Sequence, residues 1–421
     1  MSFRYCLAFL FVFAVVGSDW ATGKNYQVFL TVNQGKEVGA KVSALTSGST
    51  FTLEAPVVTE DAIGDAAFTS ELTEQEGGKL LLAYRLKLKL PVDQKLPELS
   101  GSGNLLVAPD KTYEFLSFGE TRCSIRVAPC SGEDSPDSIV LLTGFDSDNV
   151  VALNLDSGKV MELIQLEDEA RPRGVAQSST GDIFVSLRGS GRNVLKFSMT
   201  DGKISAQPIT GTIGRYGPAQ LLMSVDDELF AACDSTHQIR RFSGGGELLE
   251  TYQGSIGGNV CGIAIYDKHL FSAHLFEGSI SKTPLSGAGE MERIFKDRDV
   301  IDRPYALTVT RDGDLLVSAY EGDGRVRKID RESGEYLGDF LDLDSSNISG
   351  VSAMLYHAQR DSYLIGKDYS VIEFGSDGKE IQRYVMEEIE RVMAISEARN
   401  VDALDSYRNF SYAEPDTTSG E

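Results

Sequence analysis

Short runs of apolar residues recur along most of this chain, and residues 303–343 show the pattern most clearly. Four runs of β-branched, aromatic and aliphatic residues, ALTVT, DLLVSAY, RVRKID and EYLGDFL, are separated by breaks rich in Gly and Asp. Runs of this length predict β-strands, and Gly and Asp tolerate the backbone angles of tight turns. The stretch therefore predicts one antiparallel unit of four strands.

The same unit recurs between residues 138 and 399. The second strand of each copy begins, in order, at Ile139, Ile183, Leu229, Leu270, Leu315 and Tyr363, so subtraction gives separations of 44, 46, 41, 45 and 48 residues. A period in the forties with four strands per unit is typical of a β-propeller. We therefore expect an all-β fold with a six-bladed β-propeller over residues 138–399.

The first and last copies are out of phase. The first copy has no matching strand before it, and the last matching strand, residues 392–396, has no further copy after it. We expect this C-terminal strand to become the innermost strand of the first blade. Such a pairing would close the ring and remove two exposed strand edges.

The regions on either side of the repeat have other patterns. Residues 24–130 contain strand-like runs without a repeat, and the alternation from Tyr84 to Leu90 is typical of a half-buried strand. We expect a small β-sandwich domain there, followed by a polar linker at residues 131–137. Residues 400–421 are polar and end in acidic residues, so we expect a disordered tail.

The first 18 residues resemble a secretory signal. A short basic start is followed by an apolar run at residues 6–16, which is too short to span a bilayer comfortably. We therefore expect a secreted or periplasmic protein without stable membrane insertion after signal removal.

The net charge bears on the possible partners, and the cysteine content bears on disulfide bonding. The formal net charge of −23 argues against nucleic acid, because phosphate binding needs a basic surface. Four cysteines remain after signal removal, Cys123, Cys130, Cys233 and Cys261. Their even number permits two disulfides in an exported protein. Cys123 and Cys130 could close a small loop, and a Cys233–Cys261 bridge is also possible.

In a propeller, the loops that lead into the first strands share one end of the ring with the loops between second and third strands. We expect binding residues on that end, and the candidates are His237, His274, Tyr320, Glu321, Arg173, Arg188, Asp234 and Lys367. The two histidines, on adjacent blades, could bind zinc or act as acid and base, or they could be structural. Arg173 could pair with a neighbouring carboxylate or bind an anionic ligand.

Two copies, SSTGDIFVSLRGSGRNVLKFSMTDGK and VTRDGDLLVSAYEGDGRVRKIDRESGE, resemble the six-bladed propeller superfamily of NHL-repeat proteins and gluconolactonase-like hydrolases. The resemblance implies a divalent cation held in the channel by Glu, Asn and Asp oxygens, ligands that suit calcium. Asn259, Asp302 and Asn347 lie at matching ends of the expected inner strands and could supply ligands, or they could be ordinary turn and capping residues. The glutamate of those hydrolases has no secure counterpart in this chain.

These features predict a binding or scaffold protein that recognises a protein, peptide or glycan through the end of the propeller that carries His237, His274 and Tyr320. The alternative is a calcium- or zinc-dependent hydrolase or lyase of the gluconolactonase-like type. The two hypotheses differ in whether a metal occupies the channel.

Overall fold

The structure is a computed structural model. It describes residues 26–34, 37–46, 50–58, 63–75, 79–89, 99–109, 111–118, 121–129, 138–188, 194–209, 217–253, 256–287, 291–320, 324–342, 350–386 and 388–412. The expected signal peptide and linker lie outside these ranges. The chain divides into two compact units, one of residues 1–135 with segments 155–159 and 382–387, and one of the remaining residues.

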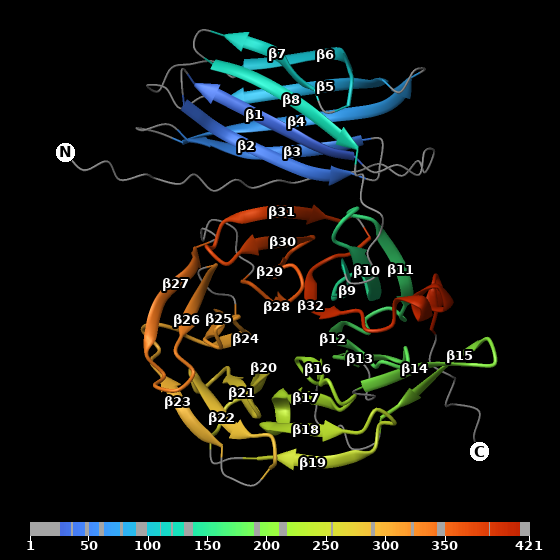
Figure 1. Ribbon diagram of the computed structural model, residues 1–421, viewed down its shortest axis with the longest axis vertical. Helices are drawn as coiled ribbons and strands as arrows, with labels where there is room; N and C mark the ends of the chain where they lie inside the picture. The colour runs from blue at the N-terminus through green and yellow to red at the C-terminus, as the bar shows by residue number, and fades with distance from the viewer. Residues whose placement is uncertain are drawn as a thin grey trace. The chain divides into compact units, whose positions relative to one another are not determined.

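The first unit contains two four-stranded antiparallel sheets, with strand orders β2-β1-β8-β7 and β3-β4-β5-β6 (Figure 1). The strands are β1 (Tyr26–Gln34), β2 (Glu37–Thr46), β3 (Thr50–Val58), β4 (Ile63–Gln75), β5 (Lys79–Lys89), β6 (Leu99–Val107), β7 (Thr112–Phe118) and β8 (Thr121–Pro129).

One hydrophobic core joins the two sheets. Val28 and Ile125 of one sheet belong to the same buried cluster as Phe68 and Leu82 of the other. The ring of Phe115 in β7 packs edge-on against Phe68 in β4, with centroids 5.7 Å apart. This arrangement confirms the expected β-sandwich, in which each sheet buries one face.

The described residues of the rest of the chain form six further sheets. Their strand orders are β32-β9-β10-β11-β33, β12-β13-β14-β15, β16-β17-β18-β19, β20-β21-β22-β23, β24-β25-β26-β27 and β28-β29-β30-β31. The sheets lie around a common centre with one end strand of each innermost, which confirms the expected all-β propeller-type fold (Figure 1).

The first three of these sheets contain β9 (Ile139–Gly144), β10 (Asn149–Asn154), β11 (Val160–Gln165), β12 (Pro172–Gln177), β13 (Ile183–Leu187), β14 (Val194–Thr200), β15 (Lys203–Pro208), β16 (Leu221–Met223), β17 (Leu229–Cys233), β18 (Gln238–Phe242), β19 (Leu248–Tyr252), β32 (Val392–Glu397) and β33 (Phe410–Ser411). The other three contain β20 (Val260–Tyr266), β21 (His269–His274), β22 (Ser279–Pro284), β23 (Glu292–Lys296), β24 (Pro304–Val309), β25 (Leu315–Ala319), β26 (Arg325–Ile329), β27 (Tyr336–Asp342), β28 (Ala353–His357), β29 (Ser362–Lys367), β30 (Ser370–Gly375) and β31 (Glu380–Val385).

The C-terminal strand pairs with the first strand of the propeller, as expected. β32 is antiparallel to β9, with Ile395 opposite Leu142 and Glu397 opposite Val140. The sheet that begins the propeller is therefore built from both ends of this part of the chain, which ties distant segments together.

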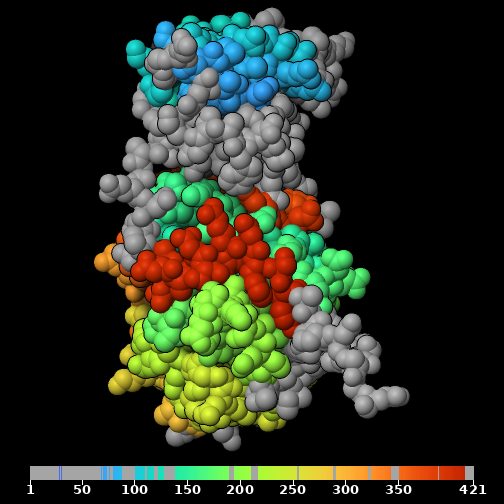
Figure 2. All heavy atoms as spheres, turned by 90° about the vertical axis from the view of Figure 1, so that its right-hand side faces the viewer, coloured from blue at the N-terminus to red at the C-terminus, as the bar shows by residue number. Residues whose placement is uncertain are grey.

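The expectation of a disordered tail is wrong for residues 400–412. This segment forms the 3₁₀ helix η3 (Val401–Tyr407) and β33, which is parallel to β11. Leu404 and Tyr407 are buried in one hydrophobic cluster with Phe197, and Figure 2 shows the red C-terminal residues covering this side of the propeller. Apolar residues spaced along a polar segment thus supply enough buried surface to order it. Residues 413–421 lie outside the described part.

Neither of the two disulfides that the sequence permits is present among the described cysteines. Cys123, Cys233 and Cys261 are buried and free, while Cys130 lies outside the described residues. Cys123 points into the sandwich core from β8, and burial raises the pKa of Cys233 and of Cys261 to about 12. In the part of the chain that the structure describes, no helix has the length and apolar character needed to cross a membrane.

Candidate functional site

The direction of the strands gives the propeller two ends with different loops. We call the end with the loops into the first strands and between second and third strands the loop face. The opposite end, where turns join first to second strands, is the turn face. The sequence analysis placed every candidate binding residue on the loop face.

Two of those candidates form a buried ion pair. Arg173 in β12 places Nη1 2.6 Å from Oδ2 of Asp234 and donates from the same nitrogen to the carbonyl of Gly217. Arg173 Nη2 lies 3.5 Å from the hydroxyl of Tyr305. Arg173 and Asp234 are 7% and 6% exposed. The pair therefore links neighbouring blades inside the propeller, which supports the ion-pair interpretation of Arg173.

The two histidines have different environments. His274 is fully buried, and its Nε2 lies 2.8 Å from Ser281 Oγ and 3.1 Å from Ser272 Oγ. Burial lowers the pKa of His274 to about 4. His237 is exposed at the end of a short 3₁₀ helix, η2 (Asp234–Thr236), with a φ of 58°. The two serines and the strand core enclose His274, which supports the structural interpretation of this histidine, and it shares no exposed surface with His237.

Two further binding candidates, Tyr320 and Lys367, contribute little exposed surface. Tyr320 is half-buried, with its ring centroid 5.0 Å from that of Tyr305. Lys367 is buried at the end of β29. Glu321 lies outside the described residues.

The three candidate calcium ligands, Asn259, Asp302 and Asn347, do not share one environment. Asn259 is half-buried and its backbone carbonyl accepts a hydrogen bond from Leu275. Asp302 is exposed and lies 3.7 Å from the guanidinium of its neighbour Arg303. Asn347 lies outside the described residues. Within the described ranges, no three His, Cys, Asp or Glu side chains are grouped as metal ligands would be. Calcium or zinc binding stays a prediction.

Arg188 belongs to a cluster that the sequence analysis did not recognise. The guanidinium carbons of Arg171, Arg188 and Arg391 lie 6.0, 5.7 and 4.9 Å from the ring centroid of Phe145. Phe145 is 4% exposed and follows β9 directly. Three cations from three loops therefore meet at one buried aromatic ring on the loop face.

A cavity opens on the turn face instead. Its volume is about 790 Å³. Apolar side chains from the inner strands of five sheets line it, among them Leu222, Ile265, Leu307, Leu355 and Ile395. Its charged residues are three acidic, Asp226, Glu228 and Glu397, and three basic, Arg241, Lys268 and Arg399. The side chains of Asp226, Lys268 and Glu397 are exposed, so the cavity is accessible from solvent.

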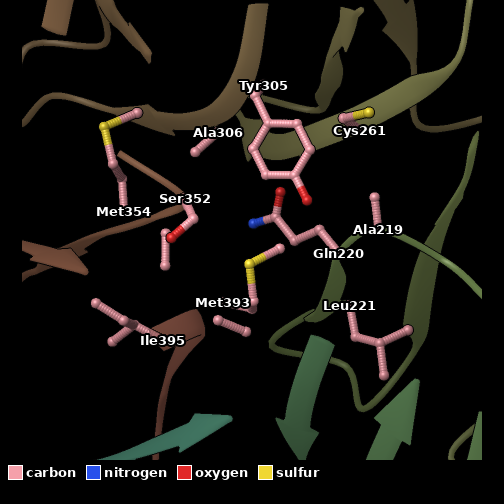
Figure 3. A pocket seen from close by; sticks show the side chains of 12 residues that line it. Ala219, Gln220, Leu221, Cys261, Tyr305, Ala306, Ser352, Met354, Met393 and Ile395 are labelled. Carbon is pink, nitrogen blue, oxygen red and sulfur yellow. The ribbon is translucent and has the colours of Figure 1, made fainter. Parts of the chain in front are cut away.

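A smaller hollow adjoins the cavity and shares four lining residues with it, Gln220, Leu221, Met354 and Ile395. Figure 3 shows the side chains that line this hollow. Gln220 Oε1 accepts a hydrogen bond from the backbone of Ile263 at 2.7 Å, so the amide Nε2 is left to donate into the hollow. Nothing in the sequence distinguished this glutamine, whose role depends on the neighbouring blade.

Comparisons with known proteins support the propeller-type fold, but they support no particular family or function. No family model matches the chain, and no curated protein matches it. A chain in the crystal structure of a nidogen/laminin complex matches with a TM-score of 0.50 and 13% identity, over 62% of this chain and 99% of that one. Virginiamycin B lyase from Staphylococcus aureus matches with a TM-score of 0.43 and 14% identity, over 61% and 82% of the two chains. The resemblance to NHL-repeat and gluconolactonase-like proteins therefore stays a prediction.

Proposed function

We propose that this chain is a binding protein that takes up a peptide in the cavity on the turn face of its propeller. The observation that carries the proposal is the cavity of about 790 Å³, which shares Gln220 and Met354 with the smaller hollow. Ligand sites typically occupy roughly 300–1,000 Å³ and combine apolar walls with a few directed polar groups.

The chemistry of the lining favours a peptide. The apolar walls suit aliphatic or aromatic side chains, and the Gln220 amide suits a carbonyl acceptor. The charged residues are balanced, with three acidic and three basic side chains. A peptide segment offers apolar side chains, carbonyl groups and charges of both signs, whereas a simple ion or an apolar ligand would use only part of this lining.

The cavity on the turn face is a better candidate for the binding site than the loop face. On the loop face, where the sequence placed the ligand, Arg173 and Asp234 are buried in their own ion pair. Export is part of the proposal and is supported by the character of residues 1–18.

The test is selection of linear peptides from a phage-displayed library on the purified full chain. Leu355→Trp adds bulk to the cavity, and Leu249→Trp makes the same change at an exposed position on the outer strand β19. Selected peptides should bind the Leu355→Trp variant at least about tenfold more weakly, equivalent to 1.4 kcal/mol, and the Leu249→Trp variant as they bind the parent. Equal binding to both variants, or the absence of any selected peptide, would contradict the proposal.

A further inference from the structure

The segment that follows β32 forms one side of the cavity on the turn face. The described residues that line the cavity include none from β12–β15, the second blade, but they include Arg399. The backbone N–H groups of Arg399 and Asn400 donate to Oε1 of Gln177, the last residue of β12, at 2.8 and 2.9 Å. The segment therefore lies across the end of β12 and takes the place of the second blade in the cavity wall.

The side chain of Arg399 reaches from this segment to the turn between β16 and β17, in the third blade. Its Nη1 donates to the carbonyl of Ser224 and to Oδ1 of Asp227, both at 2.7 Å. Its Nη2 donates to the carbonyl of Val225 at 3.3 Å. Ser224 and Val225 also line the cavity. Because a guanidinium donates in a fixed, planar geometry, Arg399 holds one wall of the cavity against another.

The position of Arg399 depends on residues that lie away from the cavity. Asn400 caps η3, because its Oδ1 accepts the backbone N–H of Ala403, and its Nδ2 donates to the carbonyl of Ser179 at 3.0 Å. A Cβ atom on Gly181, in the turn between β12 and β13, would stand 2.6 Å from the Cβ of Ala403, so η3 packs directly on that turn. Leu404 is fully buried behind it. Docking of residues 400–412 therefore fixes where Arg399 stands.

We infer that docking of residues 399–412 completes the cavity, so that ligand binding there and docking of this segment stabilise each other. The inference rests on the proposed peptide site. A ligand that contacts both the segment and the β16–β17 turn binds the docked state more tightly than the undocked state. By linkage, the ligand must then favour docking by the same factor. Arg399 is the positioning residue, because it alone among these residues contacts both walls.

The probe is the tightest peptide from the phage selection, synthesised with a fluorescein label, and fluorescence anisotropy measures its binding to the full chain. Leu404→Ala loosens the docked segment without changing the cavity lining, and it should weaken binding at least about fivefold. Ser406→Ala, an exposed change in the same 3₁₀ helix, should leave binding unchanged. Arg399→Met, which keeps the bulk of the side chain but removes its donors, should weaken binding similarly. Arg311→Met removes an exposed arginine outside the cavity and should bind as the parent does.

Hydrogen exchange followed by mass spectrometry measures the coupling in the other direction and needs no variant. Saturating peptide should slow exchange of the amides of residues 399–404 at least about fivefold in the parent protein. Residues 330–335, in the turn between β26 and β27 outside the cavity lining, should exchange at the same rate with and without peptide. In the Arg399→Met protein the slowing should be lost even at saturating peptide. An arginine that only adds stability would leave it in place.

The outcomes separate this inference from the proposed function. Circular dichroism and thermal unfolding show whether each variant is folded. If the peptide binds the parent, Leu404→Ala and Arg399→Met proteins with equal affinity, the coupling is wrong while the peptide site stands. Unchanged exchange of residues 399–404 in the parent protein at saturating peptide overturns the coupling in the same way. Failure of every peptide to bind the parent protein contradicts both the peptide site and the coupling.

Discussion

Arg173 and Asp234 lie 61 positions apart in the sequence, and their side chains meet at 2.6 Å inside the propeller. Each is under a tenth exposed, so neither charge is solvated well by water. A buried charge that loses its partner keeps the full cost of desolvation. The pair therefore matters to the stability of the propeller in a way that an exposed pair does not.

Asp234→Ala should lower the free energy of unfolding by about 3–5 kcal/mol, the cost typical of an unpaired buried charge. Urea denaturation followed by circular dichroism measures the change. Asp302→Ala removes an exposed carboxylate beside Arg303 and should cost under about 1 kcal/mol. The double replacement Arg173→Met with Asp234→Leu should recover part of the loss, because neither charge then remains. Similar stability of both single variants would contradict the role of the pair.

More of the fold than of the candidate site could be predicted from the sequence. The repeat spacing and the unmatched strand at residues 392–396 were enough to predict the propeller and the β32–β9 pairing, since strand period and order are local properties. Burial of His274 was not predictable, because it depends on Ser272 and Ser281 facing the same ring.

The arginine cluster at Phe145 and the cavity depend on contacts between distant segments. Phe145 meets Arg391 because the C-terminal strand β32 returns beside β9, and it meets Arg171 and Arg188 because the neighbouring blade packs against the first. The cavity depends on how far the inner strands stand apart, which no residue pattern reports. Residues 400–412 were misjudged because their polar composition concealed buried positions such as Leu404.

His274 should make the propeller less stable in acid. The pKa of His274 is lowered by burial to about 4, against 6.5 for an ordinary histidine. Above pH 6.5 the side chain is neutral in both states and has no effect on stability. As pH falls below 6.5 the unfolded state takes up the proton first, so stability decreases until the folded pKa is reached.

Between pH 7.5 and 5.0 this effect should remove about 2 kcal/mol from the free energy of unfolding. Urea denaturation at the two pH values measures it. His274→Gln should abolish this part of the pH dependence, whereas His237→Gln, at an exposed position, should retain it. An unchanged pH dependence in the His274→Gln protein would show that another group is responsible.

The C-terminal segment should contribute directly to stability. Leu404 is fully buried, and the hydroxyl of Tyr407 donates to the carbonyl of Phe197 at 3.1 Å. Leu404→Ala should cost about 2–5 kcal/mol through lost burial and the cavity left behind. Ser406→Ala, an exposed change in the same 3₁₀ helix, should cost less than about 0.5 kcal/mol. Thermal unfolding compares the two, and equal midpoints would mean that η3 is not docked.

Gly262 should be intolerant of any side chain. It lies in β20, and a Cβ atom there would stand 2.3 Å from the carbonyl oxygen of Tyr305 and 2.8 Å from the backbone nitrogen of Leu307. Both atoms belong to the backbone of β24, the inner strand of the next sheet, so no side-chain rotation can relieve the overlap. Gly262→Ala must separate two inner strands and should cost about 1–3 kcal/mol or more.

The matched control for this substitution is Gly245→Ala, in an exposed turn where the nearest atom to a Cβ is 3.4 Å away. That change should alter stability by no more than about 0.5 kcal/mol. Because the inner strands β20 and β24 also line the cavity on the turn face, Gly262→Ala should in addition weaken peptide binding there. Urea denaturation and peptide affinity, measured on the same preparations, test both effects. Stability equal to that of the Gly245→Ala protein would show that the two inner strands do not approach each other this closely.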